Sequence, residues 1–499
     1  MSIQAWNRFE RIAAARCGAT ALIQGSRRMS FNDLRRAGLH WAARLDVAPG
    51  GRVVVSAANG AAPAAAILGI WRLGAIPVLV HAEAPDRHLA HAARLTGAAS
   101  VLVDPDRSVP DVDAQVLWTD RTDEGGPPLP APRQSGAEPA SILFTSGSSG
   151  PPKGVTQSAA TLIDGADRVA DLMGYGRGDS ILCGVHFAFD YGWGQLLSTF
   201  FCGVPLVLPE RRDAFGLCEA MAPHRPTVLA GVPALFADLL AGMSPIKRTD
   251  RGSIRLITST GSKVPGPVWS ALVGTFPDAE IALNYGLTET YRSACLPPSL
   301  ARAHPASVGF ALPGVDIAVM RPDGTRCVAD EEGEIVHRGA GAFLGYWGEP
   351  ERTAATLRPD PLWTHGGVNT PTVVFTGDLG RMDGAGLLHV HGRRDRQMKS
   401  MGVRVAPDEI EALLLESGLL TEVAVAARAN DTLGDMIVAF VVRKEATPDL
   451  KALKRHARAV MSPYMQPRDW VVLDRLPRLP SGKVDYPTLK RQACGEVAA

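Results

Sequence analysis

Residues 145–154 read TSGSSGPPKG and combine glycines, hydroxyls and one lysine. Glycines allow the backbone to turn so that successive N–H groups point into one concavity, a shape that binds phosphate. The hydroxyls add donors, and Lys153 adds a positive charge. A polar surface loop would have the same composition. A Walker loop is excluded because, counting from Gly147, the second glycine that it needs falls on Pro152.

A second chemically suggestive segment, NYGLTE, covers residues 284–289. The aromatic face of Tyr285 can stack on a purine base. The Thr288 hydroxyl can donate to a phosphate, and the Glu289 carboxylate can bind Mg²⁺, a hard cation that prefers oxygen ligands. Alone, the segment would be interpreted equally well as a strand end with a hydrogen-bonded glutamate. The nucleotide-binding interpretation is favoured because residues 145–154 offer a phosphate-binding segment in the same chain.

Both segments resemble motifs of the AMP-forming ligases, the superfamily of acyl-CoA synthetases, peptide-synthetase adenylation domains and firefly luciferase. Residues 145–154 resemble its phosphate loop, with Ser149 in place of the usual threonine. A nearer likeness is to stand-alone bacterial acyl-CoA ligases and free-standing adenylation enzymes. The resemblance implies that the following residues bind ATP: Thr145, Ser146, Gly147, Ser148, Ser149, Gly150, Lys153, Asn284, Tyr285 and Gly286.

Three further segments resemble motifs of the same superfamily. Residues 259–262 (STGS) resemble the segment that borders adenine and the acyl group, which implies that Gly261 and Ser262 face the nucleotide. Thr260 stands where glycine is usual and is expected to narrow the acid pocket. Residues 228–240 resemble the strand and helix that line this pocket, with Val232 at its wall. The TGD run resembles the motif whose aspartate, here Asp378, binds the ribose hydroxyls, and it follows an insertion at 363–374.

Residues 392–402 (GRRDRQMKSMG) resemble the hinge region of the family. The resemblance implies that Arg393 contacts ribose or phosphate, that Asp395 is the hinge, and that Lys399 faces the acceptor thiol. Residues 479–485 (LPSGKVD) resemble the C-terminal lysine loop, in which Lys483 bridges the acid carboxylate and the α-phosphate. Alone, either lysine would be interpreted as a solvated surface side chain.

Together these residues predict a two-step reaction. Attack of a carboxylate on the α-phosphate of ATP brings two anions together, so fixed positive charge must offset the repulsion. Lys483 and Thr288 would act at the α-phosphate, and Glu289 would hold Mg²⁺. The acyl-adenylate would then pass to the thiol of CoA or of carrier-bound phosphopantetheine, with release of AMP. A luciferase-like oxygenase and an inactive nucleotide-binding homologue are the remote alternatives.

Residues 186–195 (HFAFDYGWGQ) bear on the identity of the acid. In adenylation domains that select amino acids, an aspartate in a matching Phe-Asp pair binds the substrate ammonium, and Asp190 stands in such a pair. An aspartate in an apolar pocket is costly unless it is paired. We therefore expect a free amino acid, with His186 and Tyr191 as further pocket residues. Two alternatives stay open: Asp190 bonds backbone amides or His186, or the substrate is a small or medium-chain acid without an amino group.

The elements that must position these residues alternate between strand-like and helix-like runs. Strands are expected at 52–56, 75–80, 101–103 and 140–144, and helices at 62–73 and 88–95. This βαβ rhythm predicts a mostly parallel sheet, whose ligands bind beyond the carboxyl ends of the strands. Short strands at 315–320 and 333–336 predict a small β-rich unit.

The residues after 394 are expected to form a separate unit. Helices are predicted at 407–415 and 450–461, and strands at 421–427 and 436–442. The predicted fold class is α/β, with a large N-terminal domain, 1–394, of βαβ-rich sheets and a small β unit. A small mobile α+β domain, 395–499, would carry Lys483.

Bulk composition limits the partners. Among 499 residues, Lys+Arg total 52 against Asp+Glu 51, which argues against nucleic acid. Seven scattered cysteines without a C-x-x-C pair, and no signal peptide, predict a cytoplasmic protein. The apolar stretch 61–80 is interrupted by Arg72 and Pro77, which favours a buried helix and strand over a membrane span. Because the chain ends soon after Lys483, we expect the carrier protein or CoA to be a separate molecule.

Overall fold

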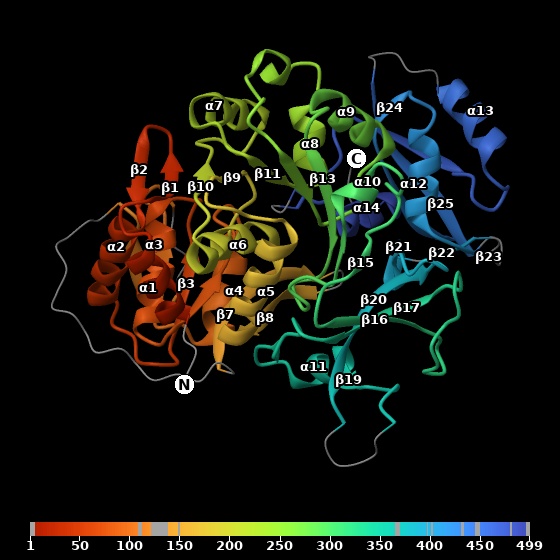
Figure 1. Cartoon of the computed structure of the whole chain (residues 1–499). Helices are drawn as coiled ribbons and strands as arrows, with labels where there is room; N and C mark the ends of the chain where they lie inside the picture. Colours follow the sequence, from red (N-terminus) through yellow and green to blue (C-terminus); the bar gives the residue numbers. More distant parts are fainter. Residues whose placement is uncertain are drawn as a thin grey trace.

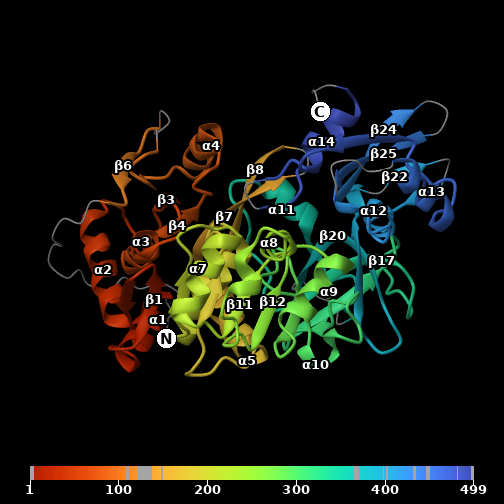
Figure 2. The same cartoon turned by 90° about the horizontal axis from the view of Figure 1, so that it is seen from above.

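The computed structural model places the chain in two large sheets, a smaller β unit and a C-terminal α+β unit (Figure 1). The C-terminal unit lies at the end of the molecule opposite the N-terminal helices (Figure 2). The structure describes residues 5–107, 112–120, 138–147, 150–364, 370–396, 398–400, 403–430, 434–444, 450–479 and 482–495.

The first large sheet carries the predicted phosphate-binding segment. Its strand order is β18-β8-β7-β4-β3-β5-β6, and its central strands pair in parallel. Val53 and Val55 of β3 belong to one hydrophobic cluster and Val54 to another, so both faces of the sheet are buried. The elements are β3 (Arg52–Ser56), β4 (Ile76–Leu79), β5 (Ser100–Val103), β6 (Gln115–Trp118), β7 (Pro139–Gly147), β8 (Gly150–Ser158), β18 (Gly345–Tyr346), α2 (Phe31–Arg44), α3 (Ala61–Arg72) and α4 (Asp86–Thr96).

The second large sheet carries the NYGLTE segment. Its strand order is β15-β14-β13-β12-β11-β9-β10-β1-β2. The parallel neighbours β11, β12 and β13 end at Gly231, Ser259 and Tyr285, which brings three predicted site segments to one edge. The strands are β1 (Thr20–Gln24), β2 (Arg27–Ser30), β9 (Ile181–Cys183), β10 (Leu206–Leu208), β11 (Val228–Gly231), β12 (Leu256–Ser259), β13 (Glu280–Tyr285), β14 (Ala294–Leu296) and β15 (Phe310–Ala311). The other α-helices of residues 5–311 are α1 (Ala5–Ala15), α5 (Ala159–Leu172), α6 (Asp190–Leu197), α7 (Ala214–His224), α8 (Pro233–Leu239), α9 (Gly266–Thr275) and α10 (Pro298–Ala301). Of these, α5 packs against β7 and β8 of the first sheet.

Two smaller units follow in the chain. The β unit contains β16 (Val315–Met320), β17 (Gly333–Gly339), β19 (Leu357–Pro359), β20 (Thr372–Met382), β21 (Leu388–Arg393) and α11 (Pro350–Thr356). The C-terminal unit contains β22 (Met398–Ser400), β23 (Val403–Val405), β24 (Leu420–Asn430), β25 (Gly434–Arg443), β26 (Asp469–Leu473), α12 (Pro407–Leu415), α13 (Leu450–Val460) and α14 (Tyr486–Ala493). Helix α12 packs against α9 and β21, so the C-terminal unit contacts both the second sheet and the β unit.

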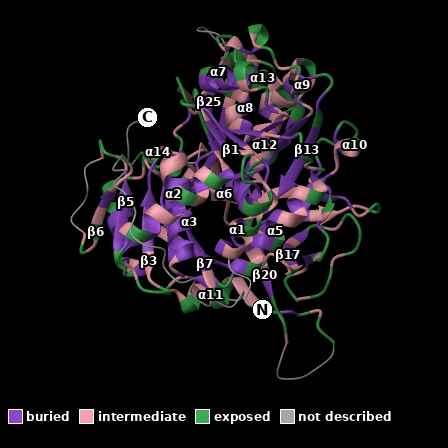
Figure 3. Ribbon diagram, turned by 60° about the vertical axis from the view of Figure 1, so that its left-hand side comes forward, coloured by how far each residue is buried: buried purple, intermediate pink, exposed green. Residues whose placement is uncertain are grey.

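The predicted strand 52–56 and helix 407–415 are confirmed without change as β3 and α12. The strand predicted at 140–144 is longer, because β7 continues into a hairpin with β8. The residues that precede β7, 121–137, are rich in proline and glycine and lie outside the described residues. No helix in the part of the chain that the structure describes is long and apolar enough to cross a membrane. Buried residues follow the sheets, as Figure 3 shows.

Gly69 marks a close crossing of α2 and α3. A Cβ atom built on Gly69 would lie 2.8 Å from the Ala42 nitrogen and 2.8 Å from the Gly38 carbonyl oxygen. We expect Gly69→Ala to lower the free energy of unfolding by about 1–3 kcal/mol, because backbone atoms must move apart. The control is Gly274→Ala in α9, where nothing lies within 4 Å of the added carbon. Urea unfolding of both variants measures the difference, and equal effects would contradict a tight crossing.

Candidate nucleotide and acid site

Lys153, Glu289 and Tyr346 form a closed triangle of hydrogen bonds. Lys153 of β8 donates from Nζ to Glu289 Oε1 at 2.8 Å and lies 2.8 Å from the Tyr346 hydroxyl. That hydroxyl donates to Glu289 Oε1 at 2.7 Å. Because β18 pairs with β8 at Tyr346 and Val155, strand pairing brings the tyrosine beside the lysine. The triangle therefore ties the first sheet to the turn that follows β13.

The environment of Glu289 keeps its carboxylate charged. The residue is 8% exposed, and burial alone would raise its pKa. The charge and hydrogen bond of Lys153, with the hydrogen bond from Tyr346, outweigh burial and hold the pKa of Glu289 below its ordinary value. Burial and the neighbouring carboxylate raise the pKa of the Tyr346 hydroxyl, which therefore keeps the proton that it donates.

The Glu289 carboxylate fits a magnesium ion as an oxygen ligand. Both side-chain hydrogen bonds reach the same carboxylate oxygen, Oε1, which leaves Oε2 able to bind a cation. Among the described residues, no group of three or more His, Cys, Asp or Glu side chains could hold a metal. One carboxylate suffices for Mg²⁺ where substrate phosphates and water complete the coordination shell.

The predicted phosphate loop is described in part. Thr145 lies opposite Lys153 in the β7–β8 pair, and its hydroxyl is buried without a hydrogen-bond partner. An orphaned buried hydroxyl beside a lysine is consistent with a missing phosphate oxygen. Ser148 and Ser149 lie outside the described residues. For the other predicted residues here, the structure describes only the backbone of Ser146, Gly147 and Gly150.

A second buried cluster joins the second sheet to the β unit. The Tyr285 hydroxyl donates to Asp378 Oδ2 of β20 at 2.7 Å. Arg393 of β21 lies opposite Asp378 in the strand register and donates to its Oδ1 at 3.3 Å. Burial raises the pKa of Asp378, and the Arg393 charge opposes that rise. The residues predicted for adenine and ribose are thus in direct contact with each other.

Lys483 reaches the site from a tight turn of the C-terminal unit. The Leu479 N–H donates to the Lys483 carbonyl, and the Gly482 N–H donates to the Leu479 carbonyl, each at 2.8 Å. A Cβ atom built on Gly261 would lie 3.5 Å from Lys483 Cε and 3.6 Å from Val232 Cγ1. The lysine therefore lies beyond the end of β12, beside residues predicted for the nucleotide and the acid.

Hydrogen bonds to the backbone position the residues between these clusters. Thr260 donates from Oγ1 to the Asn284 carbonyl at 3.0 Å, and Asn284 donates from Nδ2 to the Ser259 carbonyl at 3.4 Å. Gln157 donates to the Thr288 carbonyl at 2.9 Å. Gly261 and Ser262 are exposed just beyond β12, and Gly286 follows β13 directly. Asp395 and Lys399 follow β21, and their side chains lie outside what the structure describes.

The predicted acid-pocket residues differ in burial and in the hydrogen bonds that their side chains make within the protein. His186 is buried, and its ring nitrogens contact the Ala57 carbonyl and the Ala188 N–H, each at 3.0 Å. Burial lowers the pKa of His186 well below its ordinary value. Tyr191 is buried and hydrogen-bonded to Thr258 of β12. Asp190 begins α6, is partly exposed, and makes no hydrogen bond or ion pair within the described ranges.

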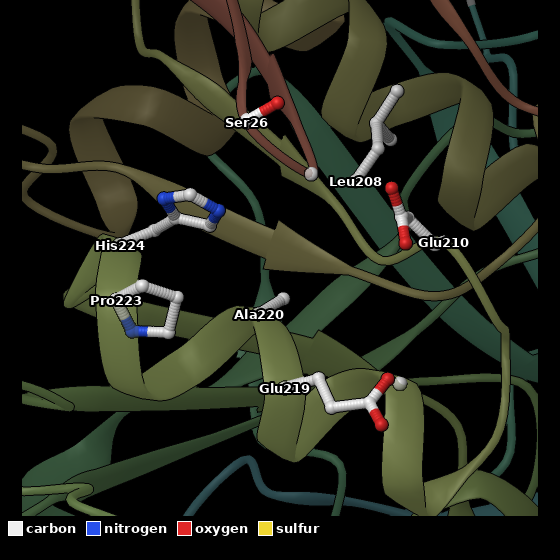
Figure 4. Close-up of a pocket in the computed structure, with 9 residues that line it drawn as sticks. Ser26, Leu208, Glu210, Glu219, Ala220, Pro223 and His224 are labelled. Carbon is white, nitrogen blue, oxygen red and sulfur yellow. The ribbon is translucent and has the colours of Figure 1, made fainter.

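A separate cavity of about 280 Å³ lies between the β1–β2 turn, the end of β10 and α7 (Figure 4). Two carboxylates and a histidine, Glu210, Glu219 and His224, are among its lining residues. None of the predicted site residues lines it, so the cavity is distinct from the nucleotide and acid site.

Two residues of the site were not predicted from the sequence. Tyr346 is an ordinary tyrosine in the run GYW, and only the pairing of β18 with β8 brings it to Glu289. Gln157 supports Thr288 from β8, and nothing in the sequence links these residues. The two contacts join residues 57 and 131 positions apart in the chain, for which the sequence offers no local signal.

The family of the chain follows from two matches. Residues 9–347 match the model of the AMP-binding enzyme family, and residues 409–483 match that of the AMP-binding enzyme C-terminal domain. The chain therefore belongs to the AMP-binding enzyme family, as the resemblance of its motifs predicted.

Individual relatives agree with this assignment. The delta-poly-L-ornithine synthetase of Acinetobacter baumannii is 29% identical over 71% of this chain, which spans only 26% of that protein's length. The indoleacetate–CoA ligase of Aromatoleum aromaticum is 31% identical, and the match covers 72% of this chain and 69% of the length of that ligase. The o-succinylbenzoate CoA synthetase of Bacillus subtilis, solved with an acyl-adenylate intermediate, has the same fold: TM-score 0.86 and 24% identity over 98% of both chains. The same protein is also solved with ATP and a magnesium ion.

Removing the Tyr346 hydroxyl tests the triangle around Glu289. Tyr346→Phe takes one hydrogen bond from the buried carboxylate, so the pKa of Glu289 should rise. Binding that needs the ionised form is lost as the pH falls through this pKa, so the loss should begin at a higher pH. We expect Mg²⁺–ATP affinity about 10-fold weaker at neutral pH. Calorimetric titration over a pH series measures this affinity, with Tyr175→Phe at a partly buried tyrosine as control. An unchanged pH dependence would contradict the triangle.

Proposed function

We propose that this chain activates a carboxylic acid with ATP, forming an acyl-adenylate and pyrophosphate, and then transfers the acyl group to a thiol with release of AMP. The position of Lys483 carries the proposal. It lies beyond β12 beside Gly261 and Val232, so a cation from the C-terminal unit meets the predicted acid wall and nucleotide segment at one point. Glu289 stays ionised in the same site, where it can bind the metal of Mg²⁺–ATP.

In the first step, a carboxylate oxygen of the acid attacks the α-phosphorus of ATP. A new P–O bond forms, and the bond to the β-phosphate oxygen breaks with its electron pair, releasing pyrophosphate. The Lys483 ammonium reduces the repulsion between the two anions, and the Thr288 hydroxyl donates to the α-phosphate. Mg²⁺, when bound at Glu289, neutralises phosphate charge.

The remaining predicted residues hold the nucleotide in line for this attack. Lys153 and the amides of residues 145–154 bind the departing phosphates. Tyr285 contacts the base, Asp378 binds the ribose hydroxyls, and Arg393 binds ribose or phosphate. Positioning of this kind accounts for much of the rate in phosphoryl transfer.

The second step requires a rotation between domains 1–394 and 395–499 about Asp395. Arg396, the next residue, pairs with Asp408 at 2.5 Å and with Glu411 at 2.9 Å. Its guanidinium also lies 3.5 Å from the centroid of the Tyr486 ring. These contacts fix Arg396 to the C-terminal domain, so a hinge at Asp395 adjoins a rigid anchor. Rotation would withdraw Lys483 and present Lys399 to the acceptor, CoA or carrier-bound phosphopantetheine.

For the acid, we propose a free amino acid. Asp190 is the one predicted pocket residue with a charge to offer, and it makes no hydrogen bond or ion pair among the described residues. A substrate ammonium would pair with it. The alternative is a small or medium-chain acid without an amino group, which the identity to an indoleacetate–CoA ligase favours. In that case Asp190 stays solvated at the start of α6.

Exchange of labelled pyrophosphate into ATP, over a panel of amino acids, aryl acids and fatty acids, tests the reaction. Lys483→Ala should lower exchange about 1000-fold or more, because it removes the fixed charge at the acid. It should leave thioester formation from a supplied acyl-adenylate nearly unchanged. Lys490→Ala, an exposed lysine of the same domain, is the control. No exchange with any acid would overturn the proposal, and equal loss of both steps would contradict the rotation.

Asp190→Asn tests the amino-acid assignment, because it keeps the size of the side chain and removes its charge. We expect kcat/KM for the best amino acid to fall about 100-fold, since its ammonium loses a partner. The deamino analogue, compared by the same exchange assay, should be affected little. Equal activity of the variant and the parent enzyme toward the amino acid would rule the assignment out.

A further inference from the structure

Arg292 is a buried cation that has no anionic partner in the described protein. It is 5% exposed, and its Nε atom has no hydrogen-bond partner. No carboxylate of the described residues pairs with its guanidinium. An arginine this deeply buried is ordinarily matched by a carboxylate or by several acceptors, because its charge cannot be removed by deprotonation.

The groups around Arg292 cannot supply the missing negative charge. Its Cζ atom lies 5.0 Å from the centroid of the Tyr191 ring, a cation–π contact that offsets burial only in part. Burial raises the pKa of the Tyr191, Tyr291 and Cys295 side chains, against the opposing effect of Arg292. These hydroxyls and the thiol therefore stay neutral, and none of them balances the charge of Arg292.

Arg292 lies on the acid side of the proposed site, away from Lys483. Its ring partner Tyr191 is hydrogen-bonded to Thr258 of β12, whereas Lys483 lies at Gly261, three residues further along the chain. Three residues of chain span at most about 10 Å. A short substrate whose activated carboxylate met Lys483 would thus point its other end toward Arg292.

Gly194 of α6 lies beside the guanidinium. A Cβ atom built on Gly194 of α6 would lie 3.7 Å from Arg292 Nη2 and 3.7 Å from the Tyr291 hydroxyl. A larger residue at Gly194 would therefore project against both groups. The preceding turn of α6 begins with Asp190, so the two charges lie near Tyr291 without pairing with each other.

The backbone immediately before Arg292 adopts a conformation that residues with a side chain rarely take. Tyr291 adopts a φ of 55°, which is unfavourable for a residue with a side chain. The Tyr291 ring packs against Gly165. A Cβ atom built on Gly165 would lie 2.5 Å from Cδ1 of this ring, so residue 165 must be glycine unless the ring shifts. Strain of this kind persists where the surrounding packing enforces it, and it gathers at ligand sites.

We propose that the activated acid carries a second carboxylate, remote from the one that is activated, and that Arg292 binds it. The planar guanidinium presents paired N–H donors that match a carboxylate in two parallel hydrogen bonds. This inference rests on the proposed function and specifies its substrate class as dicarboxylic acids, with or without an amino group. A dicarboxylic amino acid would satisfy Arg292 and Asp190 together.

Matched acid pairs in the pyrophosphate exchange assay test the inference. Succinate is compared with butyrate, glutarate with pentanoate, and glutamate with glutamine. We expect the dicarboxylic member of at least one pair to have a kcat/KM about 100-fold higher. Exchange with none of these acids and with none of the broader panel would overturn the proposed function, whereas exchange with acids of the broader panel alone would overturn only the inference. Exchange in which the monocarboxylic or amide member equals or exceeds its partner in every pair would overturn the inference alone.

Arg292→Gln should lower kcat/KM for the preferred dicarboxylic acid about 100-fold, mainly through KM, and leave its uncharged counterpart unchanged or improved. Arg292→Lys keeps the charge without the paired donors and should fall between the two. Arg72→Gln, which removes a buried arginine from α3, controls for effects on folding. Equal losses for both members of a pair would show that Arg292 only supports Tyr191. If Arg292→Gln does not fold, Arg292→Lys and the parent ranking still decide.

Discussion

The site depends on keeping one carboxylate charged inside the protein. Glu289 is buried, and an isolated buried carboxylate would take up a proton rather than bear the loss of solvation. Lys153 and Tyr346 prevent this from neighbouring strands of the first sheet. In the proposed reaction, phosphates would bring negative charge to Lys153, and a magnesium ion held by Glu289 would supply positive charge beside that carboxylate. Each of the two residues would therefore gain a ligand partner of opposite charge.

This charge balance also explains why the site is built from several units. The first sheet supplies Lys153, the second sheet ends beside Glu289, and the β unit supplies Asp378 to Tyr285. Each of these contacts joins two units in the structure. Lys483 differs, because it comes from the C-terminal unit on a short turn. In the proposed reaction, a group needed in only one of two steps is better carried by the unit that would rotate between them.

The sequence revealed the parts of this arrangement that are local. Continuous valines predicted the strand that is β3, and Pro407 with Asp408 marked the start of α12. The phosphate and adenine segments were visible because their chemistry lies within ten residues. Tyr346 and Arg292 were not visible, because their roles arise from strand pairing and burial. An arginine after Glu-Thr-Tyr reads as a surface residue until the fold encloses it.

The difference in exposure between Asp190 and Arg292 decides which of them depends more on a charged partner from the substrate. Asp190 and Arg292 both act on Tyr291 from the same region and do not pair with each other. Asp190 is partly exposed, so water can solvate it when no ammonium is present. Arg292 is only 5% exposed, so water solvates its charge far less. A substrate without an amino group would therefore cost little at Asp190, whereas one without a distal anion would leave a buried charge unmatched at Arg292. The second carboxylate is thus the firmer of the two requirements, and the amino group the more readily relaxed.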